Sequence, residues 1–185
     1  MKYKPLEKMH QTDGSDDQSR FLYSMNDFAE REPGTLLDTV HFYWDALSGD
    51  RGDLPNVTDF DARDLFGADI PDLVSSVDVR SDDPQNYLML DHPKSPLGPF
   101  GGQMINKRIR EFPNKLHREA TQKEYLICKQ TRRPFYHEID QVIGGISRHY
   151  VRVLLPLMDN SGAVVKVAVV LRRLTPSYRM FETVA

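Results

Sequence analysis

Two histidines, His137 and His149, and the single cysteine, Cys128, are the side chains best suited to a ligand site in this 185-residue chain. Imidazole and thiol groups can hold a small molecule or a metal ion. No HxH, HxxxH or CxxC pattern is present, so the sequence predicts no metal site. We take these three residues, together with Met104, as candidate ligand-binding residues. A hydrogen-bonded core residue is the simpler interpretation of each histidine.

Patterns that would indicate catalysis are missing from the sequence. No GxSxG nucleophile elbow occurs. The proline- and glycine-rich stretch 92–102 lacks the lysine and hydroxyl of a phosphate-binding loop. Glu138 and Asp140 fall on the outer face of a predicted strand, where solvated charge is expected. We therefore predict no catalytic residue and no enzymatic activity, and the sequence leaves the cofactor unknown.

The charge distribution argues against nucleic acid and membranes as partners. The chain has 24 basic and 27 acidic residues, a formal net charge of −3. Basic residues gather in 107–133 and acidic ones in 13–83, which would suit an anionic ligand or an acidic partner, although a solvated helical face is the simpler interpretation. We expect a cytoplasmic protein with no membrane span, because the apolar runs are short, no secretory signal is visible and the cysteine is alone.

Two helices and five strands are predicted to position these residues. Thr35 is a candidate N-cap for a helix ending near Ser48, and Asn114 for one that ends near Thr131, before Pro134. Shorter helical pieces are expected at 21–28, 61–65 and 104–112. The predicted strands are 73–80, 86–91, 135–143, 147–158 and 163–171.

Strand register can be inferred from the apolar face Val151, Val153, Leu155 and Leu157. A three-residue loop at 144–146 pairs that face with Phe135, His137 and Ile139, and places His149 opposite Gln141. Both histidines then face the core, with Cys128 nearby on the preceding helix. A three-residue loop at 160–162 pairs the same face with Val165, Val167, Val169 and Leu171. Gly162 takes the left-handed position of that loop.

Three segments resemble the small single-domain PAS-like proteins common in alphaproteobacteria. They are Phe42-Tyr43-Trp44-Asp45-Ala46-Leu47, Arg132-Arg133-Pro134 and Leu154-Leu155-Pro156-Leu157-Met158-Asp159. The resemblance covers about residues 38–173. It implies an α+β fold: a PAS-like five-stranded antiparallel sheet with helices packed on one face and an N-terminal helix. Residues 1–33 would be a flexible tail or short helix, 34–174 the domain, and 175–185 a C-terminal tail.

The resemblance also implies a bacterial sensory or regulatory module for signal transduction. Such a module binds a small ligand, a partner protein, or both. We expect its output to pass to another protein, because no output domain fits in the predicted tails. The alternative is a ligand-free adaptor that forms a homodimer or binds a signalling partner through Phe21–Phe28 or an exposed sheet face. The sensor predicts an internal cavity, and the adaptor predicts an exposed apolar patch.

Overall fold

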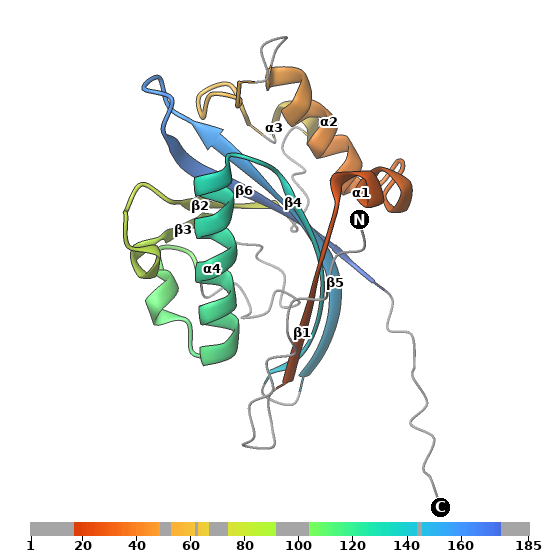
Figure 1. Cartoon of the computed structure of the whole chain (residues 1–185), viewed down its shortest axis with the longest axis vertical. Helices are drawn as coiled ribbons and strands as arrows, with labels where there is room; N and C mark the ends of the chain where they lie inside the picture. The colour runs from red at the N-terminus through yellow and green to blue at the C-terminus, as the bar shows by residue number, and fades with distance from the viewer. Residues whose placement is uncertain are drawn as a thin grey trace, which may run out of the picture.

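The computed structural model describes residues 17–48, 53–61, 63–66, 74–91, 104–143 and 146–174. They form an α+β fold with one antiparallel sheet of six strands in the order β1-β4-β5-β6-β2-β3 (Figure 1). The strands are β1 Asp17–Tyr23, β2 Val74–Asp78, β3 Leu88–Asp91, β4 Phe135–Ile143, β5 Ile146–Met158 and β6 Val164–Arg173. The helices are α1 Met25–Arg31, α2 Leu36–Ser48, α3 Arg63–Phe66 and α4 Lys115–Thr131, with 3-10 turns η1 Pro84–Asn86 and η2 Ile109–Glu111.

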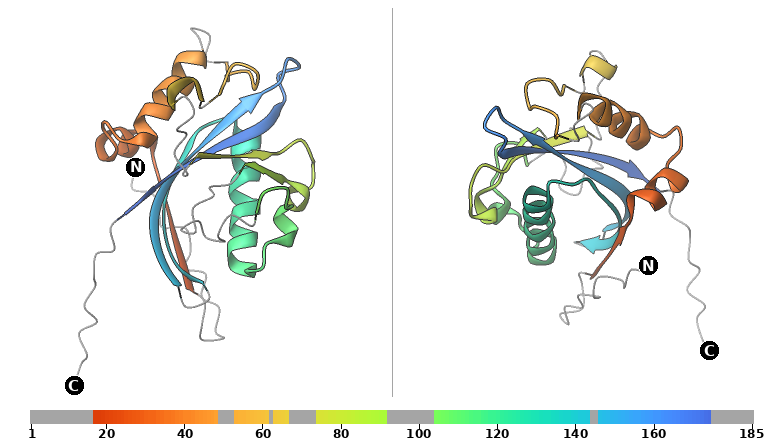
Figure 2. Two further views of the ribbon diagram at one scale, coloured as in Figure 1. Left: turned by 180° about the vertical axis from the view of Figure 1, so that it is seen from behind. Right: turned by 45° about the horizontal axis from the view of Figure 1, so that its top comes forward.

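Helices cover both faces of the sheet rather than the single face predicted. Figure 2 shows α4 on one side, here called the α4 face, and α1 and α2 on the other, called the α2 face. Both α2 and α4 pack on β5 and β6. The reason lies in these two strands, which bury residues of both alternating sets and so need cover on each side.

The two long helices begin where the sequence predicts. Thr35 Oγ1 accepts a hydrogen bond from Asp38 N at 3.3 Å, and Asn114 Oδ1 accepts one from His117 N at 2.8 Å. In α2, the predicted stripe supplies the buried Val40 and Trp44, and Trp44 Nε1 donates to the Pro156 carbonyl at 2.9 Å. The short helix expected over 104–112 is reduced to η2.

The sixth strand is formed by residues expected in a tail or short helix. β1 pairs with β4 from Asp17 opposite Val142 to Tyr23 opposite Tyr136. Ser24 then caps α1 in a capping box with Asp27, whose backbone N–H donates to Ser24 Oγ at 3.1 Å. β1 escapes prediction because the side chains it buries, Gln18 and Arg20, are polar and give no apolar alternation.

The predicted register between β4 and β5 is wrong by one residue. Ile143 pairs with Ile146, so the connection is two residues long, and residues 144 and 145 lie outside the described part of the chain. His137 therefore lies opposite Arg152 on the α4 face, whereas His149 lies opposite Asp140 on the α2 face. A one-residue slip exchanges the faces of every side chain, and a two-residue glycine turn is a common hairpin connection.

The β5–β6 turn is as predicted, but the pairing beyond it is not. Asp159 N donates to the Ala163 carbonyl at 2.9 Å across the three-residue loop, and Gly162 has a φ of 81°. A bulge between Leu157 and Met158 then shifts the register, so that Val153 pairs with Val170 instead of Val169. Because β6 is apolar on both faces, its sequence could not reveal this shift.

Candidate functional site

A group of buried polar side chains lies on the α4 face between the sheet and α4. We call it the α4-face cluster, and each member is less than a tenth exposed: Gln18, Arg20, His117, Thr121, Glu124, His137, Gln141 and Arg152. Polar side chains are rarely this buried without a set of mutual bonds. This is the largest concentration of buried charge in the described part of the chain.

Four elements bring the cluster together. β1 supplies Gln18 and Arg20, β4 supplies His137 and Gln141, and β5 supplies Arg152. Gln18 lies opposite Gln141 and His137 opposite Arg152, so these side chains share one face. On α4, the remaining three members occupy positions i, i+4 and i+7, which form a single stripe facing the sheet: His117, Thr121 and Glu124.

Glu124 is the centre of the cluster. Arg20 Nη1 and Arg152 Nη2 both donate to the same oxygen, Glu124 Oε2. His137 Nε2 lies 3.8 Å from the other oxygen, Oε1. Burial alone would raise the pKa of Glu124, but Arg152 and Arg20 outweigh it and lower the pKa to about 2. One carboxylate therefore serves two guanidinium groups.

The two histidines of the cluster are neutral at pH 7. Burial lowers the pKa of His137 to about 4, against the opposing effect of Glu124. Burial and the neighbouring Arg20 lower the pKa of His117 well below its usual range. His117 Nδ1 lies 3.1 Å from Arg20 Nη2 and 3.4 Å from Gln141 Oε1. Neither imidazole adds a positive charge.

Several buried atoms of the cluster have no hydrogen-bond partner among the described residues. They are Arg20 Nε, Arg152 Nε, Gln141 Nε2, Thr121 Oγ1 and His137 Nδ1. Arg148, which lies opposite Gln141 on the same face, adds a buried unpaired Nη1. Most of these atoms are donors, so the unused bonding capacity is suited to an acceptor.

The α2 face has a buried ion pair with a different charge balance, between Glu32 and Arg172. Glu32, 1% exposed, accepts hydrogen bonds from Arg172 Nε and Nη2, both at 2.8 Å, and from the Tyr136 hydroxyl at 2.6 Å. Here one buried carboxylate faces one guanidinium in a two-bond arrangement. Burial raises the pKa of Glu32, and the Arg172 and Tyr136 bonds more than reverse that effect. This pair is balanced, whereas the α4-face cluster has more arginine than carboxylate.

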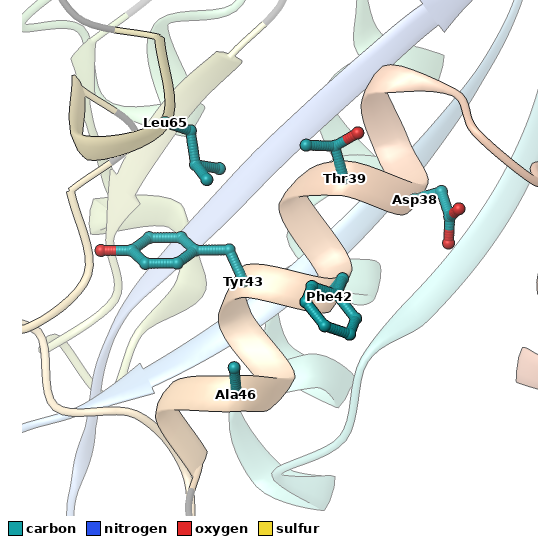
Figure 3. A pocket seen from close by; sticks show the side chains of 6 residues that line it. All are labelled: Asp38, Thr39, Phe42, Tyr43, Ala46 and Leu65. Atoms are coloured by element: carbon teal, nitrogen blue, oxygen red, sulfur yellow. The ribbon is translucent and has the colours of Figure 1, made fainter.

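Apart from the buried α4-face cluster, the surface has a hollow of about 430 Å³ beside α2 (Figure 3). Its lining residues are Asp38, Thr39, Phe42, Tyr43 and Ala46 of α2 and Leu65 of α3. The Tyr43 hydroxyl donates to Asp64 Oδ2 at 2.8 Å and so ties α3 to α2. Phe42 is 75% exposed, which leaves an aromatic ring uncovered at this hollow.

The structure brings only part of the predicted ligand site together. His137 is in the α4-face cluster, and Cys128 is buried one helical turn beyond Glu124, with a thiol whose pKa burial raises. Met104 is buried in the apolar core near β3. His149 is separated from them on the α2 face, where its Nε2 lies 2.8 Å from Glu138 Oε1. The prediction that the two histidines share a face is wrong.

The sequence contains a signal for part of what was missed. Arg152 interrupts an apolar run, between Val151 and Val153, and such a charge requires a buried partner. Glu124 lies on the apolar side of its helix, one turn before Cys128. Arg20 gives no comparable signal, because its strand resembles a polar tail.

Metal and membrane features are not found in the described residues. No group of three or more His, Cys, Asp or Glu side chains there could hold a metal ion. Within the same ranges, none of the helices combines the length and apolar character needed to cross a bilayer. The chain matches no protein-family model, and no curated protein or solved structure is found to be similar to it.

Proposed function

We propose that this chain is a PAS-like, non-enzymatic sensory or regulatory module that binds a small ligand between α4 and the sheet. The observation that carries the proposal is the set of buried, unpaired polar atoms in the α4-face cluster. The PAS-like assignment is supported by the element order: a helix, two strands, a helix and a three-strand meander. In this view β1 is an addition at the β4 edge.

Unpaired buried polar groups carry a free-energy cost that a ligand could offset. More than 90% of buried polar groups in proteins have a hydrogen-bond partner, and each one left unpaired costs about 1–3 kcal/mol. Five such atoms gather within one cluster here. A ligand that accepted their bonds would recover much of that cost, and the recovered energy would couple ligand binding to the stability of the module.

The residues of the cluster suit binding better than catalysis. The Cys128 thiol is fully buried and its pKa is raised, so it is held in the unreactive protonated form. Glu124 is engaged by two arginines and is not free to accept a substrate proton. The bonds of Arg20 and Arg152 to Glu124 hold the two guanidinium groups in place, where they can bind a ligand.

A ligand-free interaction adaptor is the second candidate, favoured by the exposed Phe42. Phe28 of the Phe21–Phe28 segment is 2% exposed and so is not available for contact, and α2 and α4 pack on opposite faces of β5 and β6. The hollow beside α2 would then be the contact surface of a homodimer or a signalling partner.

Native mass spectrometry of freshly purified full-length chain tests the two candidates together. Retained small-molecule mass, or a thermal shift with a metabolite, supports the sensor. Clean apo protein at dimer mass with no thermal shift across a metabolite panel refutes the sensor. In that case Phe42→Ser should return the dimer to monomer mass, whereas Glu119→Gln, an exposed change on α4, should leave it a dimer.

A further inference from the structure

We infer that the ligand of the α4-face cluster is a small organic anion whose oxyanion group is held by Arg20, Arg148 and Arg152. This inference rests on the proposed function, because it names the chemical class of the ligand at that same site.

The charge balance leaves an excess of positive charge. Arg20, Arg148 and Arg152 share the α4 face, and Glu124, which pairs with Arg20 and Arg152, is the one buried acid among the described residues that binds any of them. The neighbouring carboxylates Glu138 and Asp140 point to the opposite face by register. The other cluster members, His117, His137, Gln18, Gln141 and Thr121, are neutral. Buried charge that lacks a counter-charge is strongly unfavourable, so an anion is the occupant that balances this site.

The unpaired bonds also point to an oxyanion. Arg20 uses Nη1 on Glu124 and Nη2 on Gln18, at 3.1 Å for the latter, and keeps Nε unpaired. Arg152 uses Nη2 on Glu124 and also keeps Nε unpaired. Gln141 adds an unpaired Nε2 donor. Carboxylate and phosphate oxygens accept several such bonds at once, and guanidinium groups are their preferred donors in proteins.

Apolar neighbours argue for an organic body attached to the anion. Ile139 lies between His137 and Gln141 in the α4-face set of β4, and Leu154 follows Arg152 in that of β5. Both are fully buried, and Tyr125 of α4 lies with its ring 5.7 Å from the Arg152 guanidinium carbon. A bare inorganic ion would use the donors but none of this apolar surface.

Two measurements on the full-length chain test the inference. The first is thermal unfolding with butyrate, citrate, glycerol phosphate, the neutral analogue butyramide, and sodium chloride at matched ionic strength. The second is the NMR signal of the arginine Nε–H groups, assigned with Arg20→Lys and Arg152→Lys. We expect an organic anion to raise the unfolding midpoint by about 5–10 °C at one hundred times its Kd. The Nε–H signals of Arg20 and Arg152 should move with it.

A matched pair of variants separates this site from general salt effects. Arg148→Gln should weaken binding about tenfold or more, since it removes a charged donor from a half-buried position. Arg133→Gln makes the same change of charge at an exposed residue after α4 and should leave binding unchanged. A response to butyrate or citrate identifies a carboxylate ligand, and a response to glycerol phosphate alone identifies a phosphate ester; both support the inference.

Three results would overturn it. If a neutral metabolite moves the two Nε–H signals and no anion does, the sensor proposal stands and the anionic ligand is wrong. If anions raise the midpoint equally in Arg148→Gln and Arg133→Gln, with unmoved Nε–H signals, the effect is that of an adventitious ion only. If the purified protein retains no small molecule and no probe changes either measurement, both the inference and the proposed function fail.

Discussion

The stability of this fold should fall as the pH falls below neutral, and His137 should account for a defined part of the loss. In the folded protein its pKa is lowered to about 4 from an ordinary value of 6.5. At a pH between these two values, the His137 imidazole is protonated in the unfolded chain and neutral in the folded protein. The free energy of unfolding therefore decreases as the pH falls from 6.5 to 4, and the contribution levels off below that.

The size of this effect follows from the two pKa values. A difference between about 4 and 6.5 corresponds to about 3 kcal/mol for His137 alone, at about 1.4 kcal/mol per pH unit within the window. His117 adds a loss in the same direction, because its pKa is also lowered. The loss attributed to Glu124 begins only below its ordinary pKa of 4.5.

Urea denaturation at several values between pH 7 and pH 4.5 measures this slope. His137→Gln should flatten it by about 1.4 kcal/mol per pH unit, since one of the protons taken up on unfolding is removed. His149→Gln removes a histidine from the opposite face and should preserve the His137 contribution. A His137→Gln variant whose slope equals that of the unsubstituted protein would refute the assignment of a buried neutral histidine at this position.

Three further predictions concern stability, each measured by urea denaturation. Glu124→Gln should lower the free energy of unfolding by about 3–5 kcal/mol because it leaves Arg20 and Arg152 without their shared carboxylate. The control Glu119→Gln, at an exposed residue, should change the free energy of unfolding by less than about 0.5 kcal/mol. Equal effects of the two variants would contradict the central role of Glu124. Trp44→Phe should cost about 1–2 kcal/mol through the lost bond to the Pro156 carbonyl, and an unchanged midpoint would show that this bond adds nothing. Gly162→Ala should lower the free energy of unfolding by about 1 kcal/mol because φ at this position is 81°. A Cβ there meets no atom within 4 Å, so backbone strain is the whole effect. A stabilised variant would show that the turn does not need a left-handed residue.

The parts of the fold that sequence predicted well are those with strong local patterns. α2 and α4 have a capping residue and an apolar stripe, β5 and β6 contain long apolar runs, and turn residues separate the strands. Their positions agree with prediction to within a few residues. The register between paired strands could not be predicted in the same way. The apolar residues of β5 and β6 fall on both faces of the sheet, so they fit more than one register.

The α4-face cluster could not be assembled from local patterns. Arg20 and Glu124 are 104 residues apart in the chain, and they meet only because β1 joins the β4 edge. A polar strand at an edge looks like a polar tail in the sequence, so its arginine carried no sign of burial. The one-residue error in the β4–β5 register then put His137 and His149 on one face and obscured the link between His137 and Arg152.

β1 also has a consequence for how a bound ligand would be felt elsewhere. Gln18 and Arg20 are its only buried side chains, and both belong to the α4-face cluster. The strand is therefore held by its backbone pairing with β4, by the charges of the cluster and by Tyr23 at its end, which packs partly buried against the core. Thermodynamic reciprocity requires that an anion bound to Arg20 strengthen the attachment of β1 as much as attachment strengthens binding. Under the proposed function, hydrogen exchange at the backbone amides of β4 that pair with β1 would slow when the anion binds, and would so report occupancy of the site.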